Sequence, residues 1–170
     1  MSGDSIGHLF AIIGGVFLLF FLPILILTGK MDVISQNVID NAVVEFVDNA
    51  RSTAIITDSA FEKLVRKVDV AQKNCVIEIK HGSKYAILNG SDIEIHYFDY
   101  TKDEILNTIY TPSGDNQKYE MKNGDFLTVT VYNTTPTLAT KLYRMIAPGF
   151  NPKGVTIYSI YSGYIGNNPQ

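Results

Sequence analysis

The 170-residue chain contains no tryptophan and a single cysteine, Cys75. One cysteine cannot form an internal disulfide, and it excludes zinc sites built from several cysteines. Because Cys75 begins the apolar segment CVIEI, we expect it to be a small buried hydrophobic residue. The chain also lacks a basic run, and 14 basic and 17 acidic residues give a net charge of −3. This balance disfavours a nucleic acid as partner.

The sequence has none of the short motifs that commonly mark catalytic or nucleotide sites. No G-x-S-x-G, S-x-x-K, H-E-x-x-H, P-loop or G-x-G-x-x-G pattern occurs. Such motifs place a nucleophile, a metal ion or a phosphate group at a defined position. Without them, the sequence gives no reason to expect an enzyme, a cofactor or a small-molecule substrate.

Charge is missing from residues 6–27, which read IGHLFAIIGGVFLLFFLPILIL without Asp, Glu, Lys or Arg. A helix rises ~1.5 Å per residue and the hydrocarbon core of a bilayer is ~30 Å thick, so this stretch is about one span long. We therefore predict that residues 1–30 are an N-terminal transmembrane anchor and that the lipid bilayer is one partner of the chain.

A core helix and a cleaved signal both fit this stretch less well than an anchor. A buried core helix of this length would normally show a polar stripe. A cleaved secretory signal needs a basic start and a small-x-small cleavage site, whereas Asp4 is acidic and LILTGKM has no such site. The cleaved signal stays as the alternative to a retained anchor. By the positive-inside rule, Lys30 taken alone would keep the rest of the chain in the cytoplasm.

Small residues lie within the predicted span. Ala11 and Gly15 are four residues apart with Gly14 beside them, a spacing that lets two helices approach closely in lipid. Glycine is also simply common in membrane helices, so both interpretations stay open. Pro23 removes one backbone donor and should kink or locally open the helix. Ala11, Gly14, Gly15 and Pro23 are therefore the predicted helix-packing residues.

After Gly29 the pattern becomes amphipathic. Apolar residues recur every four positions, at Ile34, Val38, Ala42, Phe46 and Ala50, with Val43 and Val47 beside them. This spacing predicts a helix that continues the anchor, as one rod or broken near Gly29. We assign residues 31–56 to an amphipathic stalk helix and residues 57–170 to a separate domain.

Residues 57–170 mix short helices with alternating strands. Helices are predicted after Thr57, over 101–109 with Glu104 completing a capping box, and after Thr135-Pro136, closed by Pro148-Gly149. The stripe of that last helix comprises Leu138, Leu142, Met145 and Ile146. The sequence thus predicts an α+β fold, with a long N-terminal helix leading into a small antiparallel sheet domain with short helices.

Four details of the predicted sheet can be tested. CVIEIK should turn at His81-Gly82-Ser83 and pair with KYAIL. DIEIHYFDY should point Ile93, Ile95 and Tyr97 inward. Asn123-Gly124 between apolar runs predicts a hairpin that joins YEM to FLTVTVY. The last strand, 155–165, is apolar on both faces and is therefore predicted to be central.

Asp92, Glu94 and His96 alternate along one predicted strand, so their side chains share a face. Carboxylates and an imidazole can bind a divalent metal or transfer protons. The alternative is the wet face of a half-buried strand, which we adopt because no second cluster of ligands is visible. His81 is expected in a turn, and His8 lies within the predicted span, near the membrane edge.

An apolar N-terminal helix that becomes amphipathic and precedes an antiparallel sheet is the plan of pilins and pseudopilins. The run QNVIDNAVVEFVDNARSTAIITDSAFEKLVRKVD resembles the stalk of small TadE-like, pilin-related proteins of Gram-positive bacteria, and YEMKNGDFLTVTV and IYSIYSGYIG resemble the same poorly characterised family. The resemblance covers most of the chain. It implies a non-enzymatic subunit of a tight-adherence or type IV pilus-like assembly or secretion machine, with its domain outside the cytoplasm and related subunits packed on its N-terminal helix.

One departure from that plan bears on polymerisation. Type IV prepilins are cut after a glycine, and a glutamate five residues later neutralises a neighbour's N-terminus in the filament. Here the fifth residue after Gly3 is His8, and the fifth after Gly15 is Phe20. The resemblance therefore favours a minor component over a polymerising major pilin.

Two other functions share this sequence signature. One is a single-span, membrane-anchored binding module whose tyrosine-rich C-terminal part contacts a ligand. The tyrosines concerned are Tyr110, Tyr119, Tyr132, Tyr158, Tyr161 and Tyr164. Tyrosine is also an ordinary strand residue, so the same pattern fits a plain sheet. The other function is a membrane-linked component of a virion.

Overall fold

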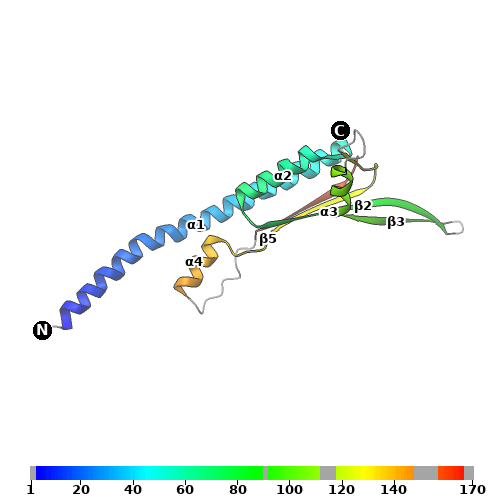
Figure 1. Ribbon diagram of the computed structural model, residues 1–170. Coiled ribbons are helices and arrows are strands. Elements are labelled where there is room, and N and C mark those ends of the chain that lie inside the picture. Colours follow the sequence, from blue (N-terminus) through cyan, green and yellow to red (C-terminus); the bar gives the residue numbers. More distant parts are fainter. Residues whose placement is uncertain (1–2, 90–91, 112–117, 148–156, 167–170) are drawn as a thin grey trace. The chain divides into compact units, whose positions relative to one another are not determined.

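The chain has an α+β fold, with a long N-terminal helix followed by a small antiparallel sheet and short helices, as predicted (Figure 1). The computed structural model describes residues 3–89, 92–111, 118–147 and 157–166. Its elements are α1 (Gly3–Thr53), β1 (Ile55–Thr57), α2 (Asp58–Ala71), β2 (Cys75–Asn89), β3 (Asp92–Thr101), α3 (Lys102–Tyr110), β4 (Lys118–Glu120), β5 (Phe126–Asn133), α4 (Leu138–Ile146) and β6 (Tyr158–Tyr164).

Helix α1 is uninterrupted from Gly3 to Thr53 and passes through both Pro23 and Gly29. The break considered near Gly29 is therefore absent. A single proline removes one backbone donor, and the hydrogen bonds on either side are enough to keep the helix together. The helix ends where Ala54 adopts a positive φ of 58° and the chain enters β1.

The chain divides into two compact units. Met1–Ile34 and Pro136–Thr156 form the N-terminal unit, and Ser35–Thr135 with Ile157–Gln170 form the sheet unit. The first part of α1 thus groups with α4, while its remainder belongs to the sheet unit. We describe each unit separately.

The sheet unit contains a four-stranded antiparallel sheet of order β3-β2-β5-β6 and a two-stranded sheet of β1 and β4. In the larger sheet, Ile77 lies opposite Val131 and Ile79 opposite Val129, so these four buried side chains share a face. This face belongs to the same apolar core as α1, α2 and α3. From α1 the core takes Ile39, Ala42, Val43, Phe46, Val47 and Ala50.

The helical period of the stalk was predicted correctly, but not its first two core positions. Ile34 and Val38 are 60% and 38% exposed, whereas Ile39, Val43 and Val47 are buried. A strict spacing of four drifts around a helix of 3.6 residues per turn, so the buried face must also use spacings of three. The prediction included Val43 and Val47 beside the row of every fourth residue, but it missed Ile39 and extended the row too far toward the N-terminus.

Two predicted strand connections are wrong. β2 runs through His81, Gly82 and Ser83 as one strand, because this segment pairs with β3 on one side and largely with β5 on the other. Asn123-Gly124 does form a tight turn, with Gly124 at a φ of +89° and the Asp125 N–H donating to the Lys122 carbonyl at 3.1 Å. The flanking strands do not pair with each other, since β4 joins β1 and β5 joins β2 and β6.

The last strand is an edge strand, which corrects the prediction of a central one. Its described part is β6, and it pairs only with β5. Tyr158, Ile160 and Tyr164 on its outer face are about half exposed. Aromatic and β-branched residues fit any pleated, half-buried surface, so their presence on both faces did not require a central position. Residues 155–156 of the predicted strand lie outside the described residues.

The caps of the helices explain where α2, α3 and α4 begin. The Thr57 hydroxyl accepts a hydrogen bond from the Ala60 N–H at 3.2 Å, as predicted for α2. The Glu104 carboxylate accepts from the backbone N–H of Thr101 at 2.7 Å, the predicted return contact of a capping box. Thr137 is the N-cap of α4 and the helix begins at Leu138, so Pro136 lies before the helix and not in its first turn. The predicted close at Pro148-Gly149 lies outside the described residues.

Beyond the four-stranded part, β2 and β3 continue together as a two-stranded extension (Figure 1). We call this extension, residues 83–89 and 92–98, the arm. Ile93, Ile95 and Tyr97 were predicted to point inward, but they are 68%, 55% and 44% exposed. Leu88, opposite Ile93, is 77% exposed, so this face of the arm is largely exposed.

Candidate functional site

The most exposed apolar surface lies on the first part of α1. By length and composition, α1 is the one helix in the described part of the chain that could cross a membrane. Core helices and signal sequences share these properties, but a core helix would be buried. Here Phe10 is 70% exposed and Leu19 69% exposed, and almost none of this stretch is buried. The structure therefore provides one candidate single-pass anchor.

The predicted packing residues are all found on this exposed surface. A Cβ atom built on Gly14 or Gly15 would have nothing within 4 Å. Ala11 and Pro23 are exposed too, as is His8. The described part of the chain thus brings no second element onto Ala11, Gly14, Gly15 or Pro23. A packing role for these residues requires another molecule.

A buried polar cluster lies at the base of the arm, and the sequence did not predict it. The His81 imidazole bonds through Nδ1 to the Tyr119 hydroxyl at 2.7 Å and through Nε2 to Oδ2 of Asp125 at 2.9 Å. The exposed fractions of His81, Tyr119 and Asp125 are 3%, 8% and 1%. The Tyr100 ring stacks on the imidazole, with centroids 5.6 Å apart.

The Asp125 carboxylate is the centre of this cluster. Burial raises its pKa, but hydrogen bonds from the Lys84 and Lys122 backbone N–H groups and from His81 lower it more, so the net pKa lies below the usual aspartate range. These two N–H groups bind at 2.9 and 2.8 Å. Burial is also the main cause of a raised pKa of Tyr119, whose phenol stays protonated.

This arrangement favours a structural role for the cluster. His81, Tyr119 and Asp125 resemble a proton-transfer group, but each is buried and already satisfied by the others. Asp125 joins the turn after β4 to the middle of β2 through its bonds to Lys122 and Lys84. The only sequence signal was Asp125 directly after Asn-Gly, a position where a carboxylate commonly binds nearby backbone N–H groups.

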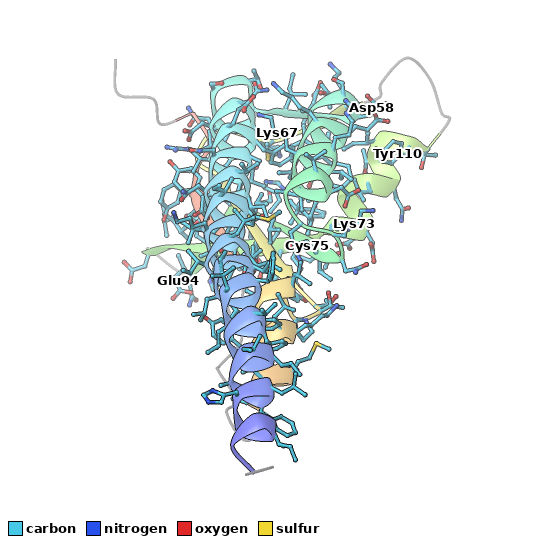
Figure 2. The ribbon with its side chains drawn as sticks, turned by 90° about the vertical axis from the view of Figure 1, so that its left-hand side faces the viewer. Asp58, Lys67, Lys73, Cys75, Glu94 and Tyr110 are labelled. Atoms are coloured by element: carbon cyan, nitrogen blue, oxygen red, sulfur yellow. The ribbon has the colours of Figure 1, made fainter. Side chains whose placement is uncertain are left out.

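The other predicted cluster lies on the arm. Asp92, Glu94 and His96 share a face, as predicted, and all three are exposed. Glu94 points away from the helices in Figure 2. Its carboxylate lies 3.4 Å from Nε2 of His96. Within the described residues, no three His, Cys, Asp or Glu side chains are grouped so that they could hold a metal ion.

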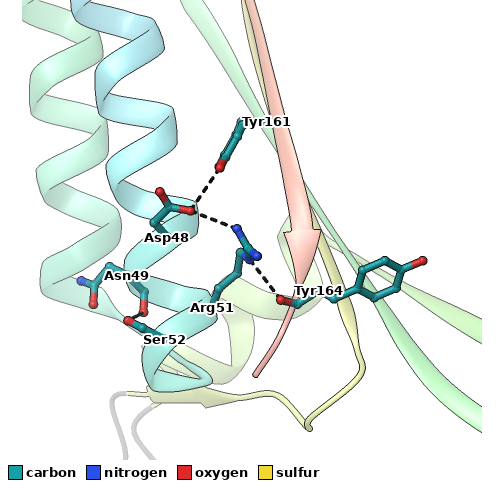
Figure 3. Close-up of polar contacts among 6 residues, drawn as sticks. All are labelled: Asp48, Asn49, Arg51, Ser52, Tyr161 and Tyr164. Atoms are coloured by element: carbon teal, nitrogen blue, oxygen red, sulfur yellow. Dashed lines mark hydrogen bonds and ion pairs between the residues drawn. The ribbon is translucent and has the colours of Figure 1, made fainter. Parts of the chain in front are cut away.

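A polar clasp joins the end of α1 to β6 (Figure 3). The Nε group of Arg51 donates to the Tyr164 carbonyl at 3.0 Å, and its Nη1 lies 3.1 Å from the Asp48 carboxylate. The Tyr161 hydroxyl donates to the same carboxylate at 3.3 Å. Gly163 makes room for the clasp, because a Cβ there would lie 2.6 Å from Nε of Arg51.

A shallow groove between α1 and α2 carries charge but offers little space. Glu45 pairs with Lys63 at 2.6 Å and also with Lys67. Hydrogen bonds from these two lysines lower the pKa of the Glu45 carboxyl to about 2. The groove has a volume of about 30 Å³, room for about two water molecules. It is too small for a metabolite.

No protein-family model, no curated protein and no solved structure matches the chain. Its function is therefore inferred from the geometry of its own residues. Exposed apolar surfaces lie on the first part of α1 and on the arm.

Proposed function

We propose that this chain is a structural, non-enzymatic, pilin-like minor subunit of a tight-adherence or type IV pilus-like assembly or secretion machine. In this proposal α1 anchors the chain in the membrane, and the sheet unit lies outside the cytoplasm. One observation carries the proposal: α1 is a single uninterrupted helix with an exposed apolar first part and a second part built into a folded core.

This design suits an assembly subunit for a physical reason. Ile39, Val43 and Val47 fix the second part of α1 in the core of the sheet unit. The first part presents an uncharged surface, which is stable only when lipid or another apolar helix covers it. In lipid, small residues such as Ala11 and Gly15 let a neighbouring helix approach closely.

Gly15→Leu tests the packing part of this proposal. Nothing lies within 4 Å of the added Cβ, so the change leaves the isolated chain undisturbed. We expect loss of lateral association, measured by cross-linking the full chain in native membranes, with an unchanged melting temperature of the sheet unit. Ile13→Phe is the matched control, because it adds bulk about 160–200° around the helix from Ala11 and Gly15.

The two variants separate packing from general bulk. Association that survives Gly15→Leu, or that is lost equally in Ile13→Phe, contradicts the proposal. Protease accessibility from each side of the membrane, together with the intact mass of the mature chain, tests the orientation and the retained anchor. Degradation only from the cytoplasmic side would place the sheet unit inside.

The arm favours a second candidate function, a membrane-anchored binding module. Leu88, Ile93 and Ile95 form an exposed apolar face on the arm, and Tyr97 at its base hydrogen-bonds Tyr164. Leu88→Ser with Ile93→Ser should abolish partner binding if the arm carries it, while Gly15→Leu should not. The opposite pattern supports the assembly subunit. A membrane-linked virion component would instead be recovered in purified particles.

A further inference from the structure

Helix α4 has an apolar face that the fold does not use. Leu138, Met145 and Ile146 are 59%, 77% and 46% exposed, although they belong to the stripe predicted for this helix. The buried residues of α4 are instead the small Ala139 and Thr140. The helix therefore uses its small side for packing and leaves its large apolar side chains uncovered.

The start of α4 is fixed to α1 within the N-terminal unit. The hydroxyl of Thr137, the N-cap residue, donates to the buried Asp32 carboxylate at 2.7 Å. The same hydroxyl accepts from the Thr140 N–H at 3.3 Å. Asp32 and Thr137 are 5% and 0% exposed, so this contact excludes water. It determines where along α1 the helix α4 begins.

That place coincides with the expected surface of the bilayer. Asp32 follows Leu27, the last residue of the uncharged stretch, by five residues, or about 7.5 Å along a helix. Each headgroup layer of a bilayer is roughly 5–7 Å thick. With residues 6–27 in the hydrocarbon core, α4 begins at the outer part of the headgroup layer.

The charges around this place complement a lipid surface. Lys141 and Arg144 are exposed on α4, where Lys141 flanks Met145 at one edge of the apolar face, and Lys30 is exposed on α1. A short helix with exposed large apolar residues and basic residues beside and behind them is the pattern of a helix that lies in a membrane interface. Basic residues at this depth attract anionic headgroups.

We propose that α4 is a second membrane contact, an interfacial helix that inserts Leu138, Met145 and Ile146 into the surface of a bilayer containing anionic lipid. Asp32 and Thr137 hold it at that depth. The inference rests on the anchoring part of the proposed function and is independent of its pilin-like role. A second copy of the chain could cover the same face, and a measurement of depth in the bilayer distinguishes the two.

The test measures depth at single sites in the full chain, reconstituted into vesicles of zwitterionic and anionic phospholipid. Cys75→Ser removes the native thiol, whose pKa is raised by burial and which is half buried. Single cysteines then carry an environment-sensitive fluorophore at Met145, at Leu18 in the expected span, and at Ser52 near the far end of α1. Quenching by a lipid-attached and by an aqueous quencher then shows whether each fluorophore lies in lipid or in water.

We expect the Leu18 and Met145 probes to be quenched several-fold more by lipid-attached than by aqueous quencher, with Met145 shallower. The Ser52 probe should show the reverse, since about 37 Å of helix separates it from Leu27. Lys141→Glu should reduce lipid quenching at Met145 in anionic vesicles, and Lys141→Arg should retain it.

Each remaining outcome overturns one claim. If the Met145 probe is quenched only by the aqueous quencher while the Leu18 probe is quenched from lipid, α4 is not an interfacial helix, but α1 is still the anchor. A Met145 probe shielded from both quenchers, with energy transfer between chains, shows that a second copy covers the face. A Leu18 probe quenched only from water overturns the anchor, and the proposed function with it.

Discussion

The two parts of α1 are both rich in apolar residues, yet they differ in what covers those residues. Over residues 6–27 the apolar side chains are spread all round the helix and nearly all are exposed. Over residues 39–50 they form one face, and Ile39, Val43 and Val47 are fully buried in the sheet unit. One helix thus contains a part whose environment lies outside the chain and a part whose environment is the chain itself.

The difference shows that exposure of apolar residues, rather than their burial, indicates function. Burial in the second part explains stability, because the chain covers those residues itself. Exposure in the first part has no cause within the described chain, and it therefore indicates a partner, either lipid or another helix. The same substitution should act on folding in one part and on membrane association in the other.

The largest expected effect comes from a charge placed in each part. Val47→Asp buries a carboxylate without a partner, which costs several kcal/mol against a total stability of about 5–15 kcal/mol. We expect the sheet unit to unfold, as seen by circular dichroism. Val16→Asp should leave its melting temperature unchanged and reduce membrane insertion, measured by alkaline extraction. Equal unfolding by both variants would remove the distinction between the two parts.

The next largest effect concerns Asp125, which lies in the sheet unit and not in the anchor. Asp125→Ala leaves the Lys84 and Lys122 N–H groups and His81 without their acceptor. We expect a loss of about 3 kcal/mol or more in the free energy of unfolding. The matched Asp92→Ala, on the exposed arm, should change it by less than about 0.5 kcal/mol. Urea unfolding measures both.

Acid should act on the same carboxylate. Because the pKa of Asp125 is lowered in the folded chain, its stabilisation is complete above about pH 4 and is lost as the pH falls through that lowered pKa. Unfolding monitored between pH 7 and pH 2 should show a decline at the acid end that is smaller in Asp125→Ala. The same decline in the variant would mean that other carboxylates cause it.

A smaller effect is expected from added volume. Ala50 is 3% exposed in the core, so Ala50→Leu should overpack it and lower the free energy of unfolding by about 1–3 kcal/mol. Ala11→Leu adds the same atoms to an exposed position and should leave that value unchanged. Thermal melts of the two variants in one detergent compare them directly. A destabilised Ala11→Leu chain would show that the first part of α1 contributes to the core.

The smallest effect is expected at Pro23. Pro23→Ala restores one backbone donor inside α1, which should strengthen the helix locally by about 1 kcal/mol. Hydrogen exchange of residues 20–26 in lipid should slow, while peptides of the sheet unit exchange as before. Slower exchange throughout the sheet unit would indicate that the two parts of α1 are coupled rather than independent.

Local signals in the sequence were enough to predict the α+β class, the apolar N-terminal helix and the helix cap at Thr57. The wrong strand connection and the missed buried cluster share a cause: each depended on contacts between distant residues. His81-Gly82-Ser83 has turn chemistry, yet pairing with β3 and β5 keeps it in one strand. The Asp125 cluster joins residues up to 44 positions apart, which no spacing rule reveals.

The arm and α4 were harder to predict for another reason. Ile93, Ile95 and Leu138 are apolar and periodic, and such residues usually face the core of the same chain. Here they face outward. A sequence pattern identifies an apolar face, but it does not say whether the chain, a bilayer or another protein will cover it.

The close approach of Arg51 to Gly163 has a consequence for strand register. Sliding β6 by two residues would keep its faces but would place Tyr161 or Ile165 where Gly163 now lies. Their Cβ atoms would displace the guanidinium, which would then lose the Tyr164 carbonyl and Asp48. The contact of Arg51 with the last strand therefore adds to its pairing with β5, because a shifted register would cost the arginine these partners.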